Sequence, residues 1–112
     1  MLLEGTQKRK CEEILIWHGR ESQERQAMEE MAELTQALNK LWRNRRGHIR
    51  KDRTKLLNNV TEEMADVIIC LEQLIQIYSN EKEIKEVIDC KLEKTLTEMF
   101  LSVSALQNDN EA

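Results

Sequence analysis

The sequence predicts an all-α fold, and three observations lead to that prediction. The chain of 112 residues contains no proline and only three glycines, although sheet proteins spend both residues freely on turns. Aromatic residues are scarce, at 4% of the chain. Apolar residues recur at helical spacing over long segments that no turn signal interrupts. The length allows one domain, 1–112, with a modest core, and we expect it to resemble a four-helix bundle.

Three breaks divide the chain into four predicted helices. They fall at His18–Gly19, at Arg46–Gly47–His48 and at Ser79–Asn80, where residues that end helices are concentrated. The expected helices cover residues 6–17, 21–46, 53–79 and 81–106, and the polar tail 107–112 is expected to fray. The second helix begins with glutamates and ends with arginines, which suits the helix dipole, and Ser22 is its expected N-cap.

The two central helices should form an antiparallel hairpin around Gly47–His48. Each has an apolar arc broader than one neighbouring helix can cover. A chain of 112 residues offers few other covering elements. We therefore expect oligomerisation to complete the bundle, giving a homodimer or a homotetramer.

Composition excludes several classes of protein. The net charge of −4 does not indicate a nucleic-acid partner. No apolar run approaches the roughly 20 residues that span a bilayer, so no membrane segment is expected. Three cysteines without metal-type spacing, in a chain without a signal-peptide pattern, are typical of reduced thiols in a cytoplasmic protein.

Carboxylates lie where a helical core is expected. At about 100° per residue, Glu30 falls inside the apolar stripe of the second helix and Glu33 falls at its margin. The third helix repeats the pattern with Glu63 and Asp66, while Glu29 and Glu62 point outward. Burying such charges without compensation costs several kcal/mol each, in order of magnitude, and no lysine or arginine on these faces is an obvious partner.

The spacing also predicts that the four carboxylates meet. Glu30 and Asp66 lie at equal distances in sequence from residue 48, and so do Glu33 and Glu63. In an antiparallel hairpin the two pairs reach the same level and the same side. Such a cluster repels itself unless it holds a cation. Oxygen ligands favour Mg²⁺, with Mn²⁺ as a substitute, over zinc or copper.

This metal site is suited to phosphate chemistry, because a bound metal ion neutralises phosphate oxygens and acidifies water. A bundle that binds iron would usually add histidine ligands, but His18 and His48 lie outside both motifs. The alternative interpretation is that the acids are solvated edges of surface helices. Here two acidic pairs occupy corresponding helix faces and the same height along the hairpin. This coincidence favours a metal site over solvated surface acids.

At this point the two motifs resemble those of a known family. "EEMAEL" at 29–34 and "EEMADV" at 62–67 resemble the MazG-like all-α nucleoside triphosphate pyrophosphohydrolases, especially short phage-type members. The family signature is Glu-x-x-Glu, a spacer, and Glu-x-x-Asp. Glu30, Glu33, Glu63 and Asp66 match it with a 29-residue spacer, near the long end of the usual range.

The resemblance implies Mg²⁺-dependent cleavage of a (d)NTP between the α- and β-phosphates by a dimer or tetramer. Glu33 and Glu63 are then the expected catalytic residues, and Glu33, the more exposed, would orient the attacking water. Larger relatives end in a Lys…Asn…Arg pattern that binds phosphates. Here only Lys91 and Lys94 remain of it.

Five further polar residues are candidates for substrate binding because they share or adjoin the acidic faces; they are Gln23, Gln26, Lys40, Asn59 and Lys91. Solvated helix positions are the alternative for each. The basic run 43–53 is interpreted as a solvated loop, with phosphate steering as the alternative. Trp17, Trp42 and the three cysteines are expected to be packing residues.

Two other functions stay open from the sequence. One is a non-catalytic helical interaction module that keeps the bundle. The other is a hydrolase of the same fold acting on a different substrate, such as phosphoribosyl-ATP. Screening a broad panel of nucleotides for pyrophosphate release separates these functions.

Overall fold

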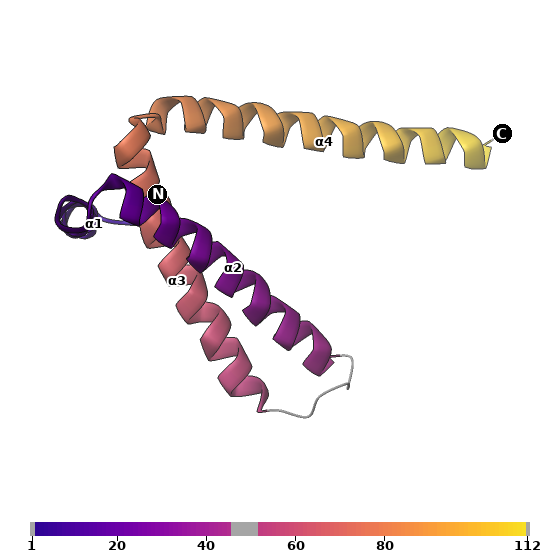
Figure 1. Cartoon of the computed structure of the whole chain (residues 1–112). Coiled ribbons are helices and arrows are strands. Elements are labelled where there is room, and N and C mark those ends of the chain that lie inside the picture. Colours follow the sequence, from indigo (N-terminus) through magenta and orange to yellow (C-terminus); the bar gives the residue numbers. More distant parts are fainter. Residues whose placement is uncertain (1, 46–51, 112) are drawn as a thin grey trace. The chain divides into compact units, whose positions relative to one another are not determined.

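The computed structural model describes residues 2–45 and 52–111 and contains four helices (Figure 1). They are α1 (Gly5–His18), α2 (Arg20–Arg45), α3 (Arg53–Tyr78) and α4 (Glu81–Glu111). No strand occurs among the described residues. The all-α prediction is confirmed. The chain divides into two compact units, Met1–Ser79 and Asn80–Ala112. The single domain expected from the sequence stays a prediction.

The predicted breaks at residues 19 and 79 are confirmed, and each has a local cause. Gly19 has φ 91°, and its backbone N–H donates to the carbonyl oxygen of Leu15 at 2.8 Å, which ends α1. Ser79 ends α3 in the left-handed region, with φ 51°. At the start of α3 the side chain of Asp52 accepts a hydrogen bond from the backbone N–H of Thr54 at 2.9 Å, a typical N-cap contact.

Two predicted helix limits are wrong, and a predicted turn falls on residues that the structure does not describe. Helix α2 begins at Arg20, directly after Gly19, so Ser22 lies within the helix and is not its cap. Helix α4 continues to Glu111, five residues beyond the predicted end. The predicted turn at 46–48 lies outside the described residues.

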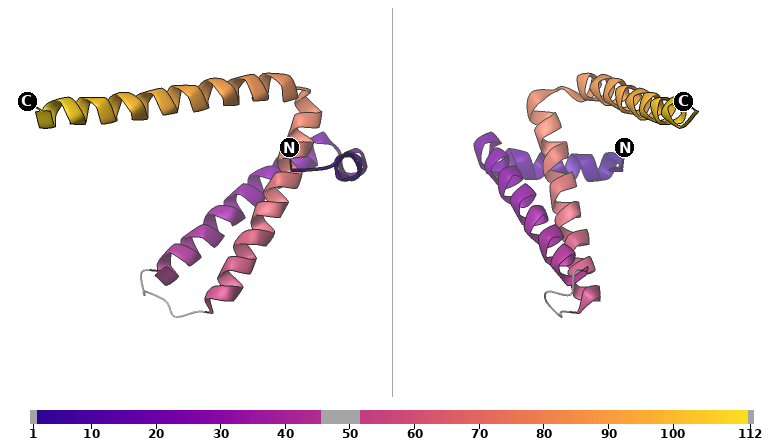
Figure 2. Two further views of the ribbon diagram at one scale, coloured as in Figure 1. Left: turned by 180° about the vertical axis from the view of Figure 1, so that it is seen from behind. Right: turned by 90° about the vertical axis from the view of Figure 1, so that its right-hand side faces the viewer.

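Helices α2 and α3 form the predicted antiparallel hairpin and lie side by side (Figures 1 and 2). Its buried cluster contains Ala37, Leu41, Leu56 and Val60, with Leu34 packed against it. Burial of their apolar surface, at about 25–30 cal/mol per Å², stabilises the hairpin. The cluster sits between the predicted carboxylates and the end of the hairpin at Arg45 and Asp52, which we call the tip.

The centre of the predicted apolar stripe on α2 is partly wrong. Helical periodicity centres that stripe on Ala27, Met31, Leu34, Leu38 and Leu41. In the structure, however, Met31 is 42% exposed and Leu38 is 48% exposed. The buried side of α2 instead includes Ala27 and Ala37. Alanine has a short side chain, so α3 approaches α2 closely along this side and leaves the two longer side chains on the flank.

Helix α1 is attached to the hairpin by buried polar groups. Gln73 of α3 is 1% exposed; its Nε2 donates to the carbonyl oxygen of Cys11 at 3.1 Å. The Nε2 of Gln23 donates to Gln73 Oε1 at 2.9 Å. This chain of hydrogen bonds joins α1, α2 and α3 and satisfies groups whose burial would otherwise be costly.

Further polar contacts to α1 involve Glu72, next to Gln73, and Gln76, about one turn further along α3. Glu72 is 4% exposed, and its Oε1 lies 3.8 Å from Lys8 Nζ. Gln76 Nε2 donates to the carbonyl oxygen of Lys8 at 3.1 Å. Helix α1 is therefore placed by specific polar contacts as well as by apolar packing.

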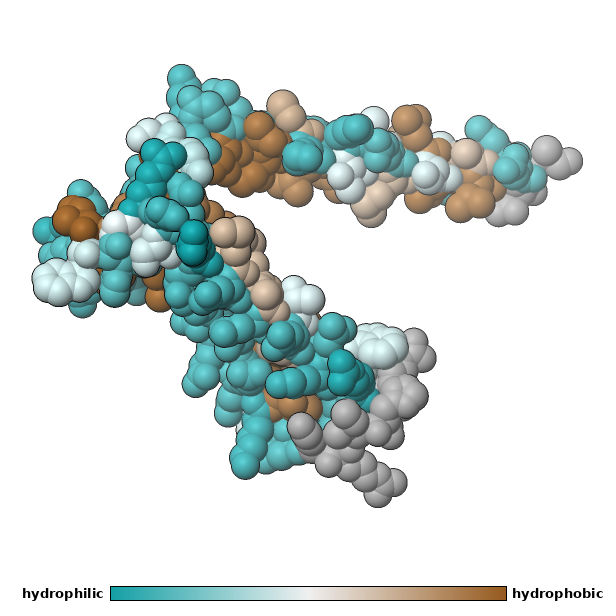
Figure 3. Space-filling view, in the orientation of Figure 1, coloured by the Kyte–Doolittle hydropathy of each residue, from teal (hydrophilic) through white to brown (hydrophobic). Residues whose placement is uncertain are grey.

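Several residues expected to pack are on the surface. Trp17 is 85% exposed and Trp42 is 53% exposed, so the packing interpretation is wrong for Trp17. Cys11 and Cys70 are buried as expected, whereas Cys90 is exposed. Figure 3 shows apolar side chains along α4 and along one edge of the hairpin. No helix in the described part of the chain is long and apolar enough to cross a membrane.

Candidate metal centre

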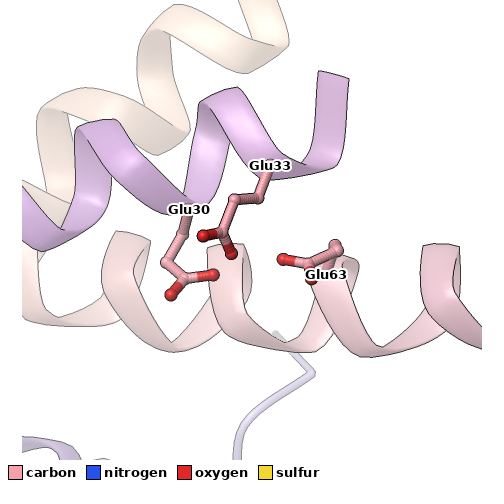
Figure 4. A group of neighbouring side chains, drawn as sticks. All are labelled: Glu30, Glu33 and Glu63. Atoms are coloured by element: carbon pink, nitrogen blue, oxygen red, sulfur yellow. The ribbon is translucent and has the colours of Figure 1, made fainter. Parts of the chain in front are cut away.

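Three carboxylates converge between the two helices of the hairpin. Glu30 and Glu33 project from α2 and Glu63 projects from α3, and one oxygen of each lies within 4.8 Å of the others. Figure 4 shows the three carboxylate groups pointing toward one another across the space between the helices. Residues three apart share a helix face, which places Glu30 and Glu33 together. The antiparallel register brings Glu63 to their level.

The cluster contains buried oxygens without hydrogen-bond partners. Oε2 of Glu30 and Oε2 of Glu63 are both inaccessible to solvent and unpaired. The other oxygen of Glu30, Oε1, accepts a hydrogen bond from Gln26 Nε2 at 2.7 Å. Glu33 is exposed, so the cluster opens to solvent on its side. Buried orphan carboxylate oxygens are costly unless an ion or a proton satisfies them.

Proton affinities reflect this environment. Burial, together with the charges of Asp66, Glu33 and Glu63, raises the pKa of Glu30 to about 7, although the hydrogen bond from Gln26 opposes the shift. Burial also raises the pKa of Glu63, and the neighbouring Glu33 and Asp66 raise it further. Desolvation and like charge therefore act in the same direction on both groups. A cation would relieve both effects.

Asp66, the fourth predicted carboxylate, lies beside the group of three and is not part of it. It is half-buried, and its charge contributes to the raised pKa of Glu30 and of Glu63. The structure therefore brings three of the four predicted ligands together and places the fourth within electrostatic reach.

Among the described residues, the surroundings of the cluster offer neither a paired countercharge nor a thiolate. In residues 2–45 and 52–111 no lysine or arginine forms an ion pair with the three glutamates. Buried Cys70 is electrostatically coupled to Glu30 and Asp66; burial first, and then these charges, raise its pKa to about 11. The thiol therefore stays protonated at neutral pH. The available donors are carboxylate oxygens, which fit hard cations such as Mg²⁺ and Mn²⁺.

The five candidate substrate-binding residues differ in burial and in distance from the carboxylates, and only some of them have a polar contact. Gln26 contacts Glu30 directly, while Gln23 is buried and its Nε2 is engaged by Gln73. Asn59 is half-buried, and Lys40 and Lys91 are exposed. Lys91 lies on α4, in the other compact unit.

Sequence reasoning missed the buried polar residues Glu72 and Gln73. The signal was present, because both interrupt the apolar run from Val67 to Ile77. A glutamate and a glutamine within such a run indicate polar groups that need buried partners. What the sequence could not supply was the identity of these partners on α1 and α2.

Comparison with known proteins identifies no relative. No family model matches the sequence, and neither a curated protein nor a solved structure matches it. The resemblance to the MazG-like family therefore rests on the two acidic motifs and stays a prediction.

Proposed function

We propose that this protein is a Mg²⁺-dependent nucleoside triphosphate pyrophosphohydrolase, which converts a (d)NTP and water to a (d)NMP and pyrophosphate. The observation that carries the proposal is the convergence of Glu30, Glu33 and Glu63, with two buried carboxylate oxygens that lack partners. Acidic residues on a helix surface are common, but unpaired buried oxygens in a group of like charges are not. They favour a site that is completed by a cation.

The roles of the residues follow from their exposure. Glu30 and Glu63, which carry the orphan oxygens, would hold the metal ion, and Asp66 would add negative charge or a further ligand. Glu33 is exposed, so it would face the arriving substrate and water, share the metal ion and orient the attacking water. The bound metal ion would neutralise phosphate charge and acidify water.

The activity test is the identity of the products. Each common nucleoside triphosphate is incubated with the protein and Mg²⁺, and nucleotides, pyrophosphate and orthophosphate are quantified by chromatography. The proposal expects monophosphate and pyrophosphate in equal amounts, and no product when a chelator removes the metal. Diphosphate with orthophosphate would mean that another bond is cut.

Matched variants connect the activity to the cluster. Glu30→Gln and Glu63→Gln should abolish turnover, because an amide does not replace a carboxylate ligand. Glu29→Gln and Glu62→Gln, at exposed positions one residue earlier, should remain active. Mg²⁺ should also raise the melting temperature of the parent by mass action and raise that of the two inactive variants much less.

A helical interaction module is the second candidate, and the amount of apolar surface favours it. Large apolar side chains are exposed on every helix, including Trp17 on α1 and Phe100 on α4, which is 72% exposed. Patches of this kind mark binding surfaces. Absence of turnover across the nucleotide panel, together with no thermal shift by Mg²⁺, would favour this function.

A further inference from the structure

The carboxylate cluster divides the charges of the α2–α3 hairpin into two groups. From the cluster toward the tip, residues 34–45 and 53–61 contain five basic side chains and no acid, and Asp52 adds one acid as the N-cap of α3. On the other side of the cluster, Arg20 and Arg25 of α2 each form an ion pair with a glutamate one turn away, at 2.9 and 3.0 Å. Positive charge without a partner on the described hairpin therefore lies toward the tip.

Lys40 is a cation on the tip side that shares the side of the carboxylates. It follows Glu33 by seven residues, which is two turns to within about 20° and about 10 Å along the helix axis. Side chains of a helix tilt toward its N-terminus, so Lys40 leans back toward Glu33, and its long flexible stem lets the ammonium group cover much of that distance. Lys40 is exposed and forms no ion pair with another described residue.

The other four cations on the tip side are placed less well. Arg43 comes ten residues after Glu33 and is turned about 80° from it, and Arg45 is turned about 120° from it and lines a hollow on another side of α2. The two cations among residues 53–55 belong to the first turn of α3, whose N-terminus is at the tip. By the same tilt they lean away from the carboxylates. Helical geometry therefore singles out Lys40.

Asn59 of α3 occupies the interval between the carboxylates and Lys40. It precedes Glu63 by four residues, one turn toward the tip, and Asp66 by seven residues, so it lies on the carboxylate side of α3. Asn59 is half-buried, and its side-chain amide forms no hydrogen bond with another described residue. An amide donor followed by an ammonium group offers successive partners to a chain of phosphate oxygens.

We infer that Lys40 binds the terminal phosphate of the substrate, so that the triphosphate lies along the carboxylate side of the hairpin with its free end toward the tip. Asn59 contacts the middle of the phosphate chain, and the nucleoside lies toward the opposite end of α2. The inference rests on the proposed function for its metal site and its substrate. It adds the direction of that substrate and the residue that distinguishes a triphosphate from shorter phosphates. General attraction by the tip would need no such contact.

Pyrophosphate binding tests the contact without turnover. The parent, saturated with Mn²⁺, is titrated calorimetrically with pyrophosphate, which corresponds to the leaving half of the substrate. Lys40→Gln should lower the pyrophosphate affinity roughly tenfold or more, as expected for the loss of a hydrogen bond to a charged group. Lys40→Arg should keep most of the affinity because it keeps the charge. Arg43→Gln removes one charge from the same end of α2 and should leave the affinity nearly unchanged. Titration with Mn²⁺ alone should give one affinity for all four proteins, which verifies that the metal centre is intact.

Steady-state kinetics test the selectivity. For the best nucleoside triphosphate of the panel, kcat/KM should fall roughly tenfold or more in Lys40→Gln. For the corresponding nucleoside diphosphate, which lacks the terminal phosphate, kcat/KM should change little. Arg43→Gln should leave the ratio of the two values as it is in the parent. Circular dichroism verifies that the variants remain helical.

Failure of this inference and failure of the proposed function give different results. Equal losses of pyrophosphate affinity in Lys40→Gln and Arg43→Gln would assign the effect to general attraction by the tip and would overturn the inference. Unchanged affinity in Lys40→Gln, or no pyrophosphate binding by the parent, would overturn it too, even if triphosphates are cleaved. If no nucleotide is cleaved but pyrophosphate binding depends on Lys40, the proposed hydrolysis is wrong and Lys40 remains a phosphate-binding residue.

Discussion

Gln26 donates a hydrogen bond from its Nε2 to Oε1 of Glu30 at 2.7 Å, one helical turn along α2. This contact uses one oxygen of Glu30, while the other, Oε2, is buried and unpaired. Gln26 therefore fixes the orientation of Glu30 and leaves Oε2 as the oxygen available to a cation. Partners behind metal ligands act in this way in many metal sites.

Replacing Gln26 should weaken metal binding without removing a ligand. Gln26→Leu keeps the approximate volume but cannot hold Glu30, so the affinity for Mn²⁺ should fall about 10–100-fold. Calorimetric titration of the parent and the variant with Mn²⁺ measures this change. Gln36→Leu, at an exposed position of α2, is the control. Equal Mn²⁺ affinities for the parent and for Gln26→Leu would show that Gln26 does not position Glu30.

The metal-free protein should lose stability between pH 4.5 and about 7. The pKa of Glu30 is raised from 4.5 to about 7 in the folded protein, so over this range the folded state binds more protons than the unfolded state. By linkage, the free energy of unfolding falls as pH rises through the window and levels off above it. Burial and like charge at Glu63 act in the same direction.

Glu30→Gln should remove much of this pH dependence. The amide is uncharged at every pH and can still accept the hydrogen bond from Gln26. At pH 8, in the presence of a chelator, the variant should melt a few degrees above the parent, whereas at pH 5 the two melting temperatures should be nearly equal. Thermal unfolding at both pH values provides the comparison. A variant that is less stable than the parent at pH 8 would argue that Glu30 is an ordinary structural residue.

The hydrogen bonds of Gln73 should contribute strongly to stability. Gln73→Leu removes the acceptor of Gln23 Nε2, which leaves a buried amide donor unpaired. It also removes the hydrogen bond to the carbonyl oxygen of Cys11, a group that lies within α1 and keeps its helical partner. The unpaired donor costs about 1–3 kcal/mol and the lost hydrogen bond about 1 kcal/mol, so the total should be about 3 kcal/mol in urea denaturation. Adding Gln23→Leu removes the unpaired donor. The double variant should then be less destabilised than the sum of the two single variants, and strict additivity would contradict the hydrogen-bonded arrangement.

The three cysteines should differ sharply in reactivity. Cys90 is exposed, whereas Cys11 and Cys70 are buried, and burial raises the pKa of both buried thiols. Because the thiolate is the reactive form, a thiol reagent at pH 8 should modify one cysteine rapidly and the other two only after denaturation. Mass spectrometry identifies the modified residue. Rapid labelling of Cys70 in the native protein would mean that the hairpin opens near the carboxylates.

The helices and the carboxylate cluster were predictable for the same physical reason. Gly19 and Ser79 mark helix ends through local backbone preferences, which the sequence expresses directly. Helical periodicity then fixes the phase of Glu30 relative to Glu33, and the antiparallel hairpin fixes their level relative to Glu63. These relationships need only the geometry of one helix and one turn.

The residues through which α1, α2 and α3 contact one another were not predictable in the same way. A broad apolar arc does not reveal which part of it meets a neighbour, so Met31 and Leu38 were expected in the core and are exposed instead. The partners of Gln73 are separated from it by 50 and 62 positions in the sequence, and no periodicity within α3 indicates them. Contacts among three helices depend on the placement of α1, which spacing along one helix does not encode.

The position of the buried cluster between the tip and the carboxylates has a consequence for the connecting segment. Ala37, Leu41, Leu56 and Val60 lock the register of α2 against α3 before the chain reaches Glu33 and Glu63. The carboxylates are thus insulated from the number of residues between Arg45 and Asp52. Doubling the length of a flexible connection costs only about 0.6 kcal/mol in loop entropy. Insertions or affinity tags in that stretch should therefore leave the carboxylates in place, and sequence searches for similar sites should fix the helical phase of the acidic pairs and allow longer spacers.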